Sequence, residues 1–228
     1  MVRVTERNAH MFWQQKERFR STRSLIMDGH HALWIDPAHF SHIFFISFKV
    51  PHLLRLAEQA ALDPDFHLNF HPRILRLVAS DSELWCNGLE RFPSLTHIHI
   101  QQRWTRDFAK FASCLPPSTR FLAIDPAFEE GLRSAVERFL DGISRSLQHS
   151  IKVLGRVLVR TPYVKRDLRD SLSQGMTGLA ILKSEPTLWL DDSIAYIRSV
   201  RGFPMQDLAN ELDCGTLYFF GRQLWGPS

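Results

Sequence analysis

The feature that most constrains the fold of this chain is a long stripe of apolar residues between positions 128 and 158. Apolar side chains recur there every three or four residues, which is the spacing of one face of an amphipathic helix. Gly131, Gly142 and Gly155 each weaken a helix by up to about 1 kcal/mol, so the stripe predicts two helices separated by a break. The stripe consists of Phe128, Leu132, Val136, Phe139 or Leu140, Ile143, Leu147, Ile151, Leu154 and Leu158.

Three shorter segments have the composition of β-strands. Residues 73–78 and 121–124 are short apolar runs, and residues 95–100 alternate apolar with polar side chains, as a half-exposed strand does. The aromatic segment 40–48 fits a buried helix or a buried strand equally well, and residues 188–200 have the pattern of another helix. These segments predict an α+β fold: a predominantly helical single domain with a small β-sheet.

Charge is concentrated at the start of the chain. The 228 residues carry a net charge of +4 and are 44% hydrophobic, which is enough apolar material for a real core. Residues 1–24 contain six basic and two acidic side chains, so they account for the whole net charge. We expect a basic, mobile N-terminal segment at 1–24 and one globular domain at 25–228.

The cysteines and the hydropathy pattern indicate a protein that is not secreted. Cys86, Cys114 and Cys214 are far apart and odd in number, which disfavours a disulfide framework. The basic start is not followed by the apolar core of a signal peptide. The most apolar run, 43–48, is far shorter than the roughly 20 residues that a membrane-spanning helix needs. We expect a location in the cytoplasm, with the nucleus or a membrane surface as alternatives.

Histidine pairs are the natural candidates for a metal site. His97 and His99 would share one face of a strand, and His67 and His71 could share one face of a helix. A zinc site needs three or four ligands, and no Cys or Glu falls at the required spacing beside either pair. We therefore expect surface histidines and no bound metal.

The sequence contains no recognisable catalytic or cofactor-binding motif. A nucleophile elbow, a phosphate-binding loop and a dinucleotide fingerprint are all missing. The carboxylate pairs Glu129–Glu130 and Asp191–Asp192 are adjacent residues that would point apart, so we expect them to mark helix starts instead of an acid–base dyad. We expect a protein that is not an enzyme and holds no cofactor.

Two basic stretches leave open an alternative, an RNA-binding protein that sequesters small RNA. The first is the basic start of the chain, residues 1–24. The stretch from Arg145 to Arg169 carries seven positive residues against one acid, Asp167, and could contact phosphates. Such charges are more often the solvated face of a helix. Residues 175–178 have the Gly-x-x-Gly pattern of an RNA-binding loop, although a flexible linker explains them more simply.

A short helix is predicted at residues 50–64, and it is the best candidate for a binding element. Pro51 suits the first turn of a helix, the following residues are rich in Leu and Ala, and Asp63–Pro64 ends the helix. Leu53, Leu54 and Leu56 would form a ridge that either joins the core or enters a groove on a partner protein.

This segment resembles a minimal F-box, the motif that docks on Skp-type adaptors. Val50-Pro51-His52-Leu53-Leu54, with nine residues before Pro64, is similar to the motif of the silencing suppressors encoded by the first ("zero") reading frame of poleroviruses and enamoviruses. Val50 in place of Leu and a spacer one residue shorter are departures from that pattern. Two later segments also resemble this family, through Trp85 and Gly88 and through Arg198, Gly202, Phe203 and Pro204.

The resemblance implies an F-box-like viral adaptor. Val50, Pro51, Leu53, Leu54, Leu56 and Pro64 would bind the Skp adaptor of a host cullin ubiquitin ligase, and another surface would bind Argonaute. Argonaute would then be degraded and host RNA silencing suppressed. The protein would act by proximity, because it raises the effective concentration of the target at the ligase.

A further alternative is a cellular F-box protein with irregular leucine-rich repeats. Residues 89–100 would form one repeat, and Leu115-Pro116-Pro117 would begin another. Such a fold needs three or more stacked units of regular length. The sequence alone shows no such register, so this alternative ranks below the viral adaptor and the RNA-binding protein.

Overall fold

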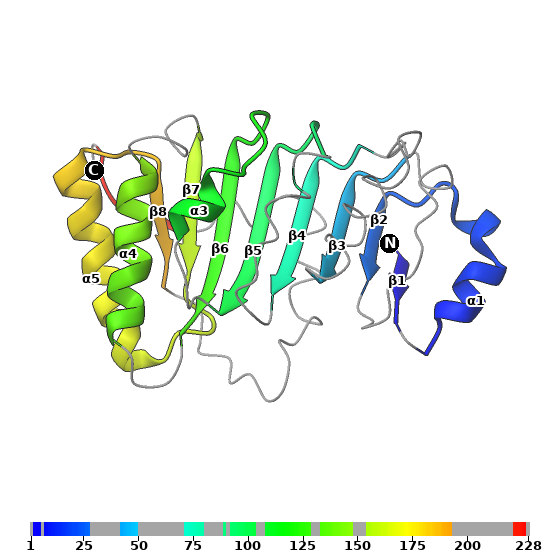
Figure 1. Ribbon diagram of the computed structural model, residues 1–228, viewed down its shortest axis with the longest axis horizontal. Coiled ribbons are helices and arrows are strands. Elements are labelled where there is room, and N and C mark those ends of the chain that lie inside the picture. Colours follow the sequence, from blue (N-terminus) through cyan, green and yellow to red (C-terminus); the bar gives the residue numbers. More distant parts are fainter. Residues whose placement is uncertain are drawn as a thin grey trace.

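Nine strands form one sheet, and their order in the sheet is their order in the chain (Figure 1). The computed structural model describes residues 2–5, 7–27, 42–49, 71–79, 89, 92–103, 108–128, 133–147, 154–192 and 221–226. Neighbouring strands from β1 to β8 are parallel, and β9 is antiparallel to β8. The strands are β1 (Val2–Val4), β2 (Ser24–Met27), β3 (Phe45–Lys49), β4 (Ile74–Ala79), β5 (His97–Arg103), β6 (Phe121–Ala127), β7 (Arg156–Arg160), β8 (Leu188–Asp191) and β9 (Arg222–Gln223).

The helices lie in the connections between strands. Helix α1 (Ala9–Gln14) and the 3-10 helix η1 (Lys16–Phe19) connect β1 to β2, and α3 (Phe108–Ala112) lies between β5 and β6. Helices α4 (Arg133–Leu147) and α5 (Arg166–Lys183) precede β7 and β8. Figure 1 shows α4 and α5 side by side at one end of the sheet and α1 at the other.

The turns before β2 to β7 repeat one hydrogen-bonding pattern. The carbonyl of Arg23 accepts from the N–H groups of Phe44 and Phe45, at 2.8 and 3.0 Å. The carbonyls of Phe44, Arg73, Thr96 and Arg120 each accept from two consecutive N–H groups of the next strand in the same way. Strand-to-strand offsets in the chain run from 21 residues (Ser24 to Phe45) to 35 (Phe121 to Arg156). The chain is therefore a stack of similar units, as in repeat proteins.

One face of the sheet carries the main core. A Leu-x-x-Leu-x-Leu-like pattern precedes and enters the strands, as in Leu95, Ile98 and Ile100, all fully buried. These side chains pack with the apolar face of α4, where Val136, Phe139 and Ile143 recur at helical spacing. Helix α5 adds Leu168, Leu172, Met176 and Ala180, spaced four residues apart. Several kcal/mol of hydrophobic stabilisation per helix follow from this burial, at about 1.5–3 kcal/mol for each large side chain.

A close approach between α3 and α4 explains a glycine inside a helix. A Cβ atom at Gly142 would lie 2.8 Å from Cβ of Phe108 and 3.0 Å from its backbone nitrogen. Real side chains do not come this close, so the contact requires glycine. Gly142 weakens a helix by its intrinsic propensity, but in the middle of α4 it allows the close contact with α3.

The prediction of a predominantly helical domain with a small sheet is wrong, because the sheet is the main element of the fold. The apolar stripe at 128–158 contains a single described helix, α4, and its last part is strand β7. Residues 188–191 form strand β8 where a helix was predicted, and helix α5, Arg166–Lys183, contains the 175–178 segment that was explained as a flexible linker. A short apolar run fits the periodicity of a helix as well as that of a strand, and packing in the sheet decides which of the two forms.

Several strand predictions are confirmed. Those at 73–78, 95–100 and 121–124 correspond to β4, β5 and β6. The undecided aromatic segment at 40–48 provides strand β3 from Phe45 onward.

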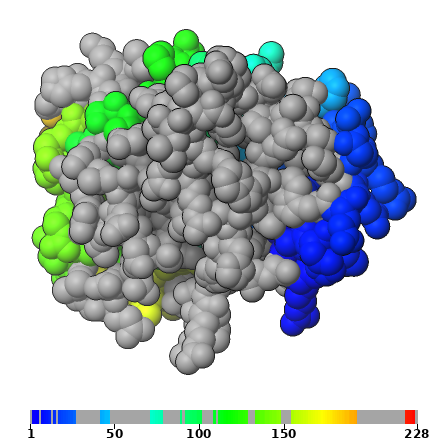
Figure 2. Space-filling model, turned by 45° about the vertical axis from the view of Figure 1, so that its right-hand side comes forward, coloured from blue at the N-terminus to red at the C-terminus, as the bar shows by residue number. Residues whose placement is uncertain are grey.

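The first residues of the chain pack with the rest of the described structure. Val4 of β1 and Phe12 of α1 are buried in the same core cluster as the strands of the main face. The Phe12 and Phe19 rings stack with their centroids 5.0 Å apart. In Figure 2 the N-terminal residues, in blue, form one flank of the visible surface, opposite the green residues from the middle of the chain. Across the described part of the chain, no helix is both long and apolar enough to cross a membrane.

Candidate functional site

The second face of the sheet carries a buried polar cluster. In a parallel sheet covered on both sides, strand interiors are normally apolar on both faces. Here polar and charged side chains follow five neighbouring strands, and each of them is at most 5% exposed. The polar cluster consists of Arg76 on β4, His99 and Gln101 on β5, Asp125 on β6, Arg160 on β7 and Asp191 on β8.

The strand register brings these side chains together. Arg76 is the cross-strand partner of His99, Gln101 is that of Asp125, and Arg160 is that of Asp191. Cross-strand partners on one face lie about 5 Å apart, so residues far apart in sequence become neighbours. Ser47 of β3, also fully buried, extends the row as the partner of Arg76.

Short contacts link the members of the cluster. Nε2 of His99 lies 3.0 Å from Oδ2 of Asp125, and both side chains are fully buried. Nε of Arg160 lies 3.8 Å from a carboxylate oxygen of Asp125 and 3.8 Å from one of Asp191. Nη2 of Arg76 donates a hydrogen bond of 2.8 Å to Oε1 of Gln101. Two guanidinium groups are thus balanced by two carboxylates.

Burial and charge set the protonation of this cluster. Burial lowers the pKa of His99, and the attraction of Asp125 only partly offsets it, so the imidazole is neutral at neutral pH. Burial alone would raise the pKa of Asp125, but the combined attraction of His99, Arg160 and Arg76 lowers it. Burial raises the pKa of Tyr163, beside the cluster, to about 12. The shifts therefore favour an ionised Asp125 beside a neutral His99.

Ring contacts flank the cluster on the amino side of the same face. The rings of His97 and Phe121 stack with centroids 4.5 Å apart and planes 10° apart. The guanidinium carbon of Arg156 lies 3.6 Å from the centre of the Trp189 ring, which is a cation–π contact. Arg156 is buried and the other three residues are partly exposed, and together they form a neighbouring row across β5 to β8.

The cluster has the composition of an acid–base site but not the access that one needs. A histidine beside a carboxylate can transfer protons when a substrate reaches it. His99 and Asp125 are both fully buried in this structure, so they have no exposed surface for a substrate to contact. Within the described ranges, no three His, Cys, Asp or Glu side chains are placed to hold a metal ion. The geometry is that of a structural network that fixes how five strands align.

The predicted binding residues lie outside the described residues. This applies to the Skp-docking candidates Val50, Pro51, Leu53, Leu54, Leu56 and Pro64. It also applies to the family-like residues Trp85, Gly88, Arg198, Gly202, Phe203 and Pro204. The prediction that these residues bind an adaptor therefore remains a prediction.

One sequence-based expectation about a single residue is wrong. His99 is fully buried on β5 and is not a surface histidine, although it does share a face with His97 as predicted. Asp191 ends strand β8 beside Arg160, and the residues that would follow a helix start at Asp191–Asp192 lie outside the described part of the chain. Its neighbour Asp192 binds Arg222 and Ser173, at 3.2 and 3.1 Å.

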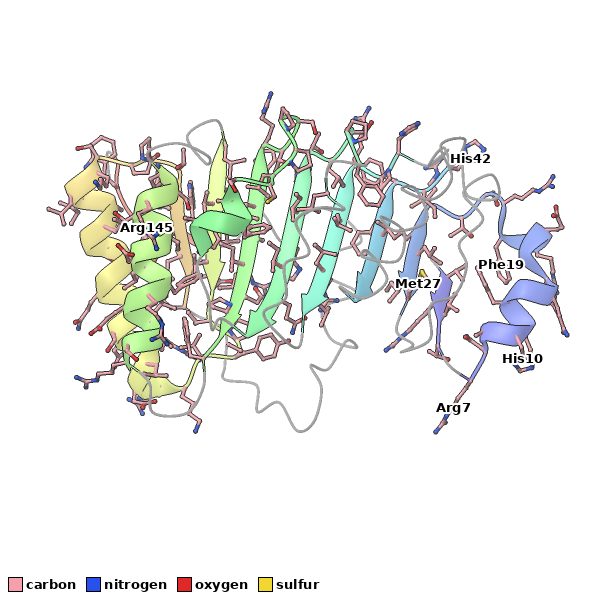
Figure 3. The ribbon with its side chains drawn as sticks, in the orientation of Figure 1. Arg7, His10, Phe19, Met27, His42 and Arg145 are labelled. Atoms are coloured by element: carbon pink, nitrogen blue, oxygen red, sulfur yellow. The ribbon has the colours of Figure 1, made fainter. Side chains whose placement is uncertain are left out.

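The basic stretch from Arg145 to Arg169 does not form one solvated face. Arg145 pairs with Asp141 on α4 at 3.1 Å, and Figure 3 shows it on that helix. Arg156 covers Trp189, and Arg160 is buried among aspartates. Arg169 donates to backbone carbonyls, and Gly175-x-x-Gly178 lies inside α5, where it is neither a nucleic-acid loop nor a linker.

One signal in the sequence could have revealed the polar cluster. Each of these polar residues alternates with buried aliphatic residues of the main core, as Arg76 does between Leu75 and Leu77. Alternation of this kind is usually interpreted as a half-exposed strand. Aligning the strands on their aliphatic positions would have placed the charges side by side.

Comparison with known proteins provides no identification: no family model, curated protein or solved structure matches this chain.

Proposed function

We propose that this chain is a recognition protein built on a leucine-rich-repeat-like scaffold, and that it works as the target-binding adaptor of a Skp–cullin ubiquitin ligase. One observation carries the scaffold part: eight parallel strands follow chain order with an equivalent turn before successive strands. Stacked repeats of this kind create extended surfaces that bind other macromolecules. A fold alone does not fix a function, so the ligase part is supported separately by the F-box-like segment.

The two parts of the proposal use different segments of the chain. The F-box-like segment, 50–64, belongs to the connection between β3 and β4. Parallel neighbours always need such a crossover connection, and this one is longer than those on either side. A helix added to a crossover can bind an adaptor without disturbing the strands. Binding would then rest on a few apolar anchors, led by Pro51, Leu53 and Leu54.

A catalytic role has less support in the described structure. The charged groups that could do acid–base chemistry are buried and paired with one another. An adaptor needs no such chemistry, because it acts by holding a target close to the ligase.

The source of the chain decides between two forms of this function. In the viral form the target is Argonaute, and the outcome is suppression of RNA silencing. In the cellular form the same scaffold binds another target. The stacked strands support this form more strongly than the sequence alone does, because a leucine-rich-repeat protein needs such repeated units. Argonaute levels in leaf cells that express the chain distinguish the two forms.

The experiment compares capture of a Skp-type adaptor by the wild-type chain and by a Pro51→Ala/Leu54→Ala variant. We expect the variant to lose capture while its thermal unfolding is unchanged. An Ile181→Ala/Leu182→Ala variant is the matched control, because it removes two apolar side chains that are 57% and 83% exposed on α5. Equal capture by the wild type and the Pro51→Ala/Leu54→Ala variant would refute the ligase part of the proposal.

A further inference from the structure

An arginine occupies the same exposed position in the turns before β2, β4 and β6. Arg23, Arg73 and Arg120 each directly precede a strand, and all three are exposed. Their backbone carbonyls occupy equivalent places in the repeated hydrogen-bonding pattern. Because neighbouring strands lie about 4.8 Å apart, arginines on every second strand are spaced by about 10 Å. We call this row the basic edge.

Among the described turn residues, no acidic side chain offsets the basic edge. Two further exposed residues, His42 and His71, lie in the turns of β3 and β4. Figure 3 shows His42 at the upper edge of the sheet, where several nitrogen-tipped side chains project outward. Glu17, an acidic residue of the described N-terminal segment, pairs with Arg20 at 2.6 Å. Asp and Glu are missing from the described turn residues, namely 20–23, 42–44, 71–73, 92–96, 113–120 and 154–155.

An exposed aromatic ring interrupts the row of arginines. Phe44 holds the equivalent position before β3, between Arg23 and Arg73, and it is 47% exposed. Burial of a phenylalanine would normally stabilise a protein, so an exposed ring flanked by two cations suggests a partner. At the other end of the row, Arg120 donates to the carbonyls of Pro117 and Thr119, at 2.9 and 3.1 Å, which holds its guanidinium group at the rim.

We propose that the basic edge binds single-stranded nucleic acid. Guanidinium groups bind phosphate oxygens through paired hydrogen bonds, and an exposed ring provides a stacking surface for an unpaired base. Phe44 favours a nucleic acid over an acidic polypeptide, because an acidic polypeptide has no base to stack. The inference goes beyond the adaptor function and uses no residue of the 50–64 segment, so either can fail without the other.

The test measures binding of the full chain to a fluorescein-labelled oligouridine of about 20 nucleotides by fluorescence anisotropy, over a series of salt concentrations. An Arg23→Gln/Arg73→Gln/Arg120→Gln variant should bind at least tenfold more weakly at low salt. Its salt dependence should also flatten, by about 2 in the log–log slope, because each lost phosphate contact on a single strand removes about 0.7.

A matched variant controls for net charge. Arg133→Gln/Arg138→Gln/Arg166→Gln removes three exposed arginines from α4 and α5, so its net charge changes equally. It should keep the wild-type affinity and slope. Phe44→Ala should weaken binding by roughly fivefold or more with an unchanged slope, because stacking releases no counterions.

Three results would overturn the inference. The first is no binding by the wild type at about 50 mM salt, where phosphate contacts are strong. The second is an equal loss in the α4/α5 control variant. The third is displacement of the RNA by polyglutamate at equal charge concentration, which would assign the edge to acidic polypeptides instead.

Discussion

Replacing Asp125 with Asn should destabilise the protein far more than any comparable change on the surface. The carboxylate is fully buried, 3.0 Å from His99 and 3.8 Å from Arg160. Asn has nearly the same volume as Asp, so no cavity forms. The expected loss of stability therefore comes from removing the buried negative charge. Breaking a buried ion pair costs about 3–5 kcal/mol, since the partner charge remains buried. Asp191 still lies 3.8 Å from Arg160, so we expect the lower end, about 3 kcal/mol.

The assay is urea unfolding at pH 7.5, with Asp141→Asn as the control. Asp141 pairs with Arg145 at 3.1 Å on α4, but the two side chains are 65% and 52% exposed. Exposed pairs contribute little, so this variant should lose less than about 1 kcal/mol. A total stability of about 5–15 kcal/mol leaves room to measure the difference. Equal losses in the two variants would refute the view that the cluster is a tightly coupled buried network.

The same cluster predicts a loss of stability in acid. The pKa of His99 is lower in the folded state than its ordinary value of 6.5, so the unfolded chain binds the proton more readily. Stability is then complete above pH 6.5 and falls as the pH drops below that value. The lowered pKa of Asp125 adds a second loss below its ordinary value of 3.8. A His99→Gln variant should lose the first of these two phases, and stability that does not change between pH 7.5 and pH 5 in the wild type would contradict this reasoning.

Two glycines inside helices and one residue at a helix end give further predictions. Gly142→Ala should destabilise by about 1–3 kcal/mol in thermal unfolding, because the new Cβ overlaps Phe108. Gly178→Ala, with nothing within 4 Å of the new Cβ, should instead stabilise by up to about 1 kcal/mol through helix propensity. Equal effects of these two changes would contradict the packing of α3 against α4. Ser184→Gly should stabilise by about 1 kcal/mol, because Ser184 ends α5 with a left-handed φ of 49° that glycine adopts without strain. A lower melting temperature in that variant would argue against this helix end.

The sequence predicted the strands better than it predicted how they combine. Residues 95–100 alternate clearly, and they form β5. The same alternation led to the expectation of a half-exposed strand, yet His99 and Ile100 are both fully buried. Exposure is a property of the whole sheet, and no local pattern reports that a second face is covered.

The helical bias of the prediction has a physical origin. Leu154 and Leu158 fit the apolar stripe at a spacing of four residues, but Leu158 is also the centre of a short apolar run with Val157 and Val159, as in a buried strand. The residues of this run form strand β7 because they pair with β6 on one side and with β8 on the other. The repeat was hidden because the units differ in length, from 21 to 35 residues. The polar cluster was hidden with it, since its members become neighbours only through the register.

The most direct test of this account is a distance across the sheet between nitroxide labels at positions 23 and 155. Both positions are exposed and belong to the repeated turn pattern, five strand steps apart. The labels would be placed on cysteines introduced into a chain with Cys86, Cys114 and Cys214 changed to Ser. Strands in chain order predict a single narrow distribution centred on roughly 24 Å, from five spacings of about 4.8 Å. A broad distribution, or one centred well beyond 30 Å, would contradict the ordered parallel sheet on which the proposed recognition function rests.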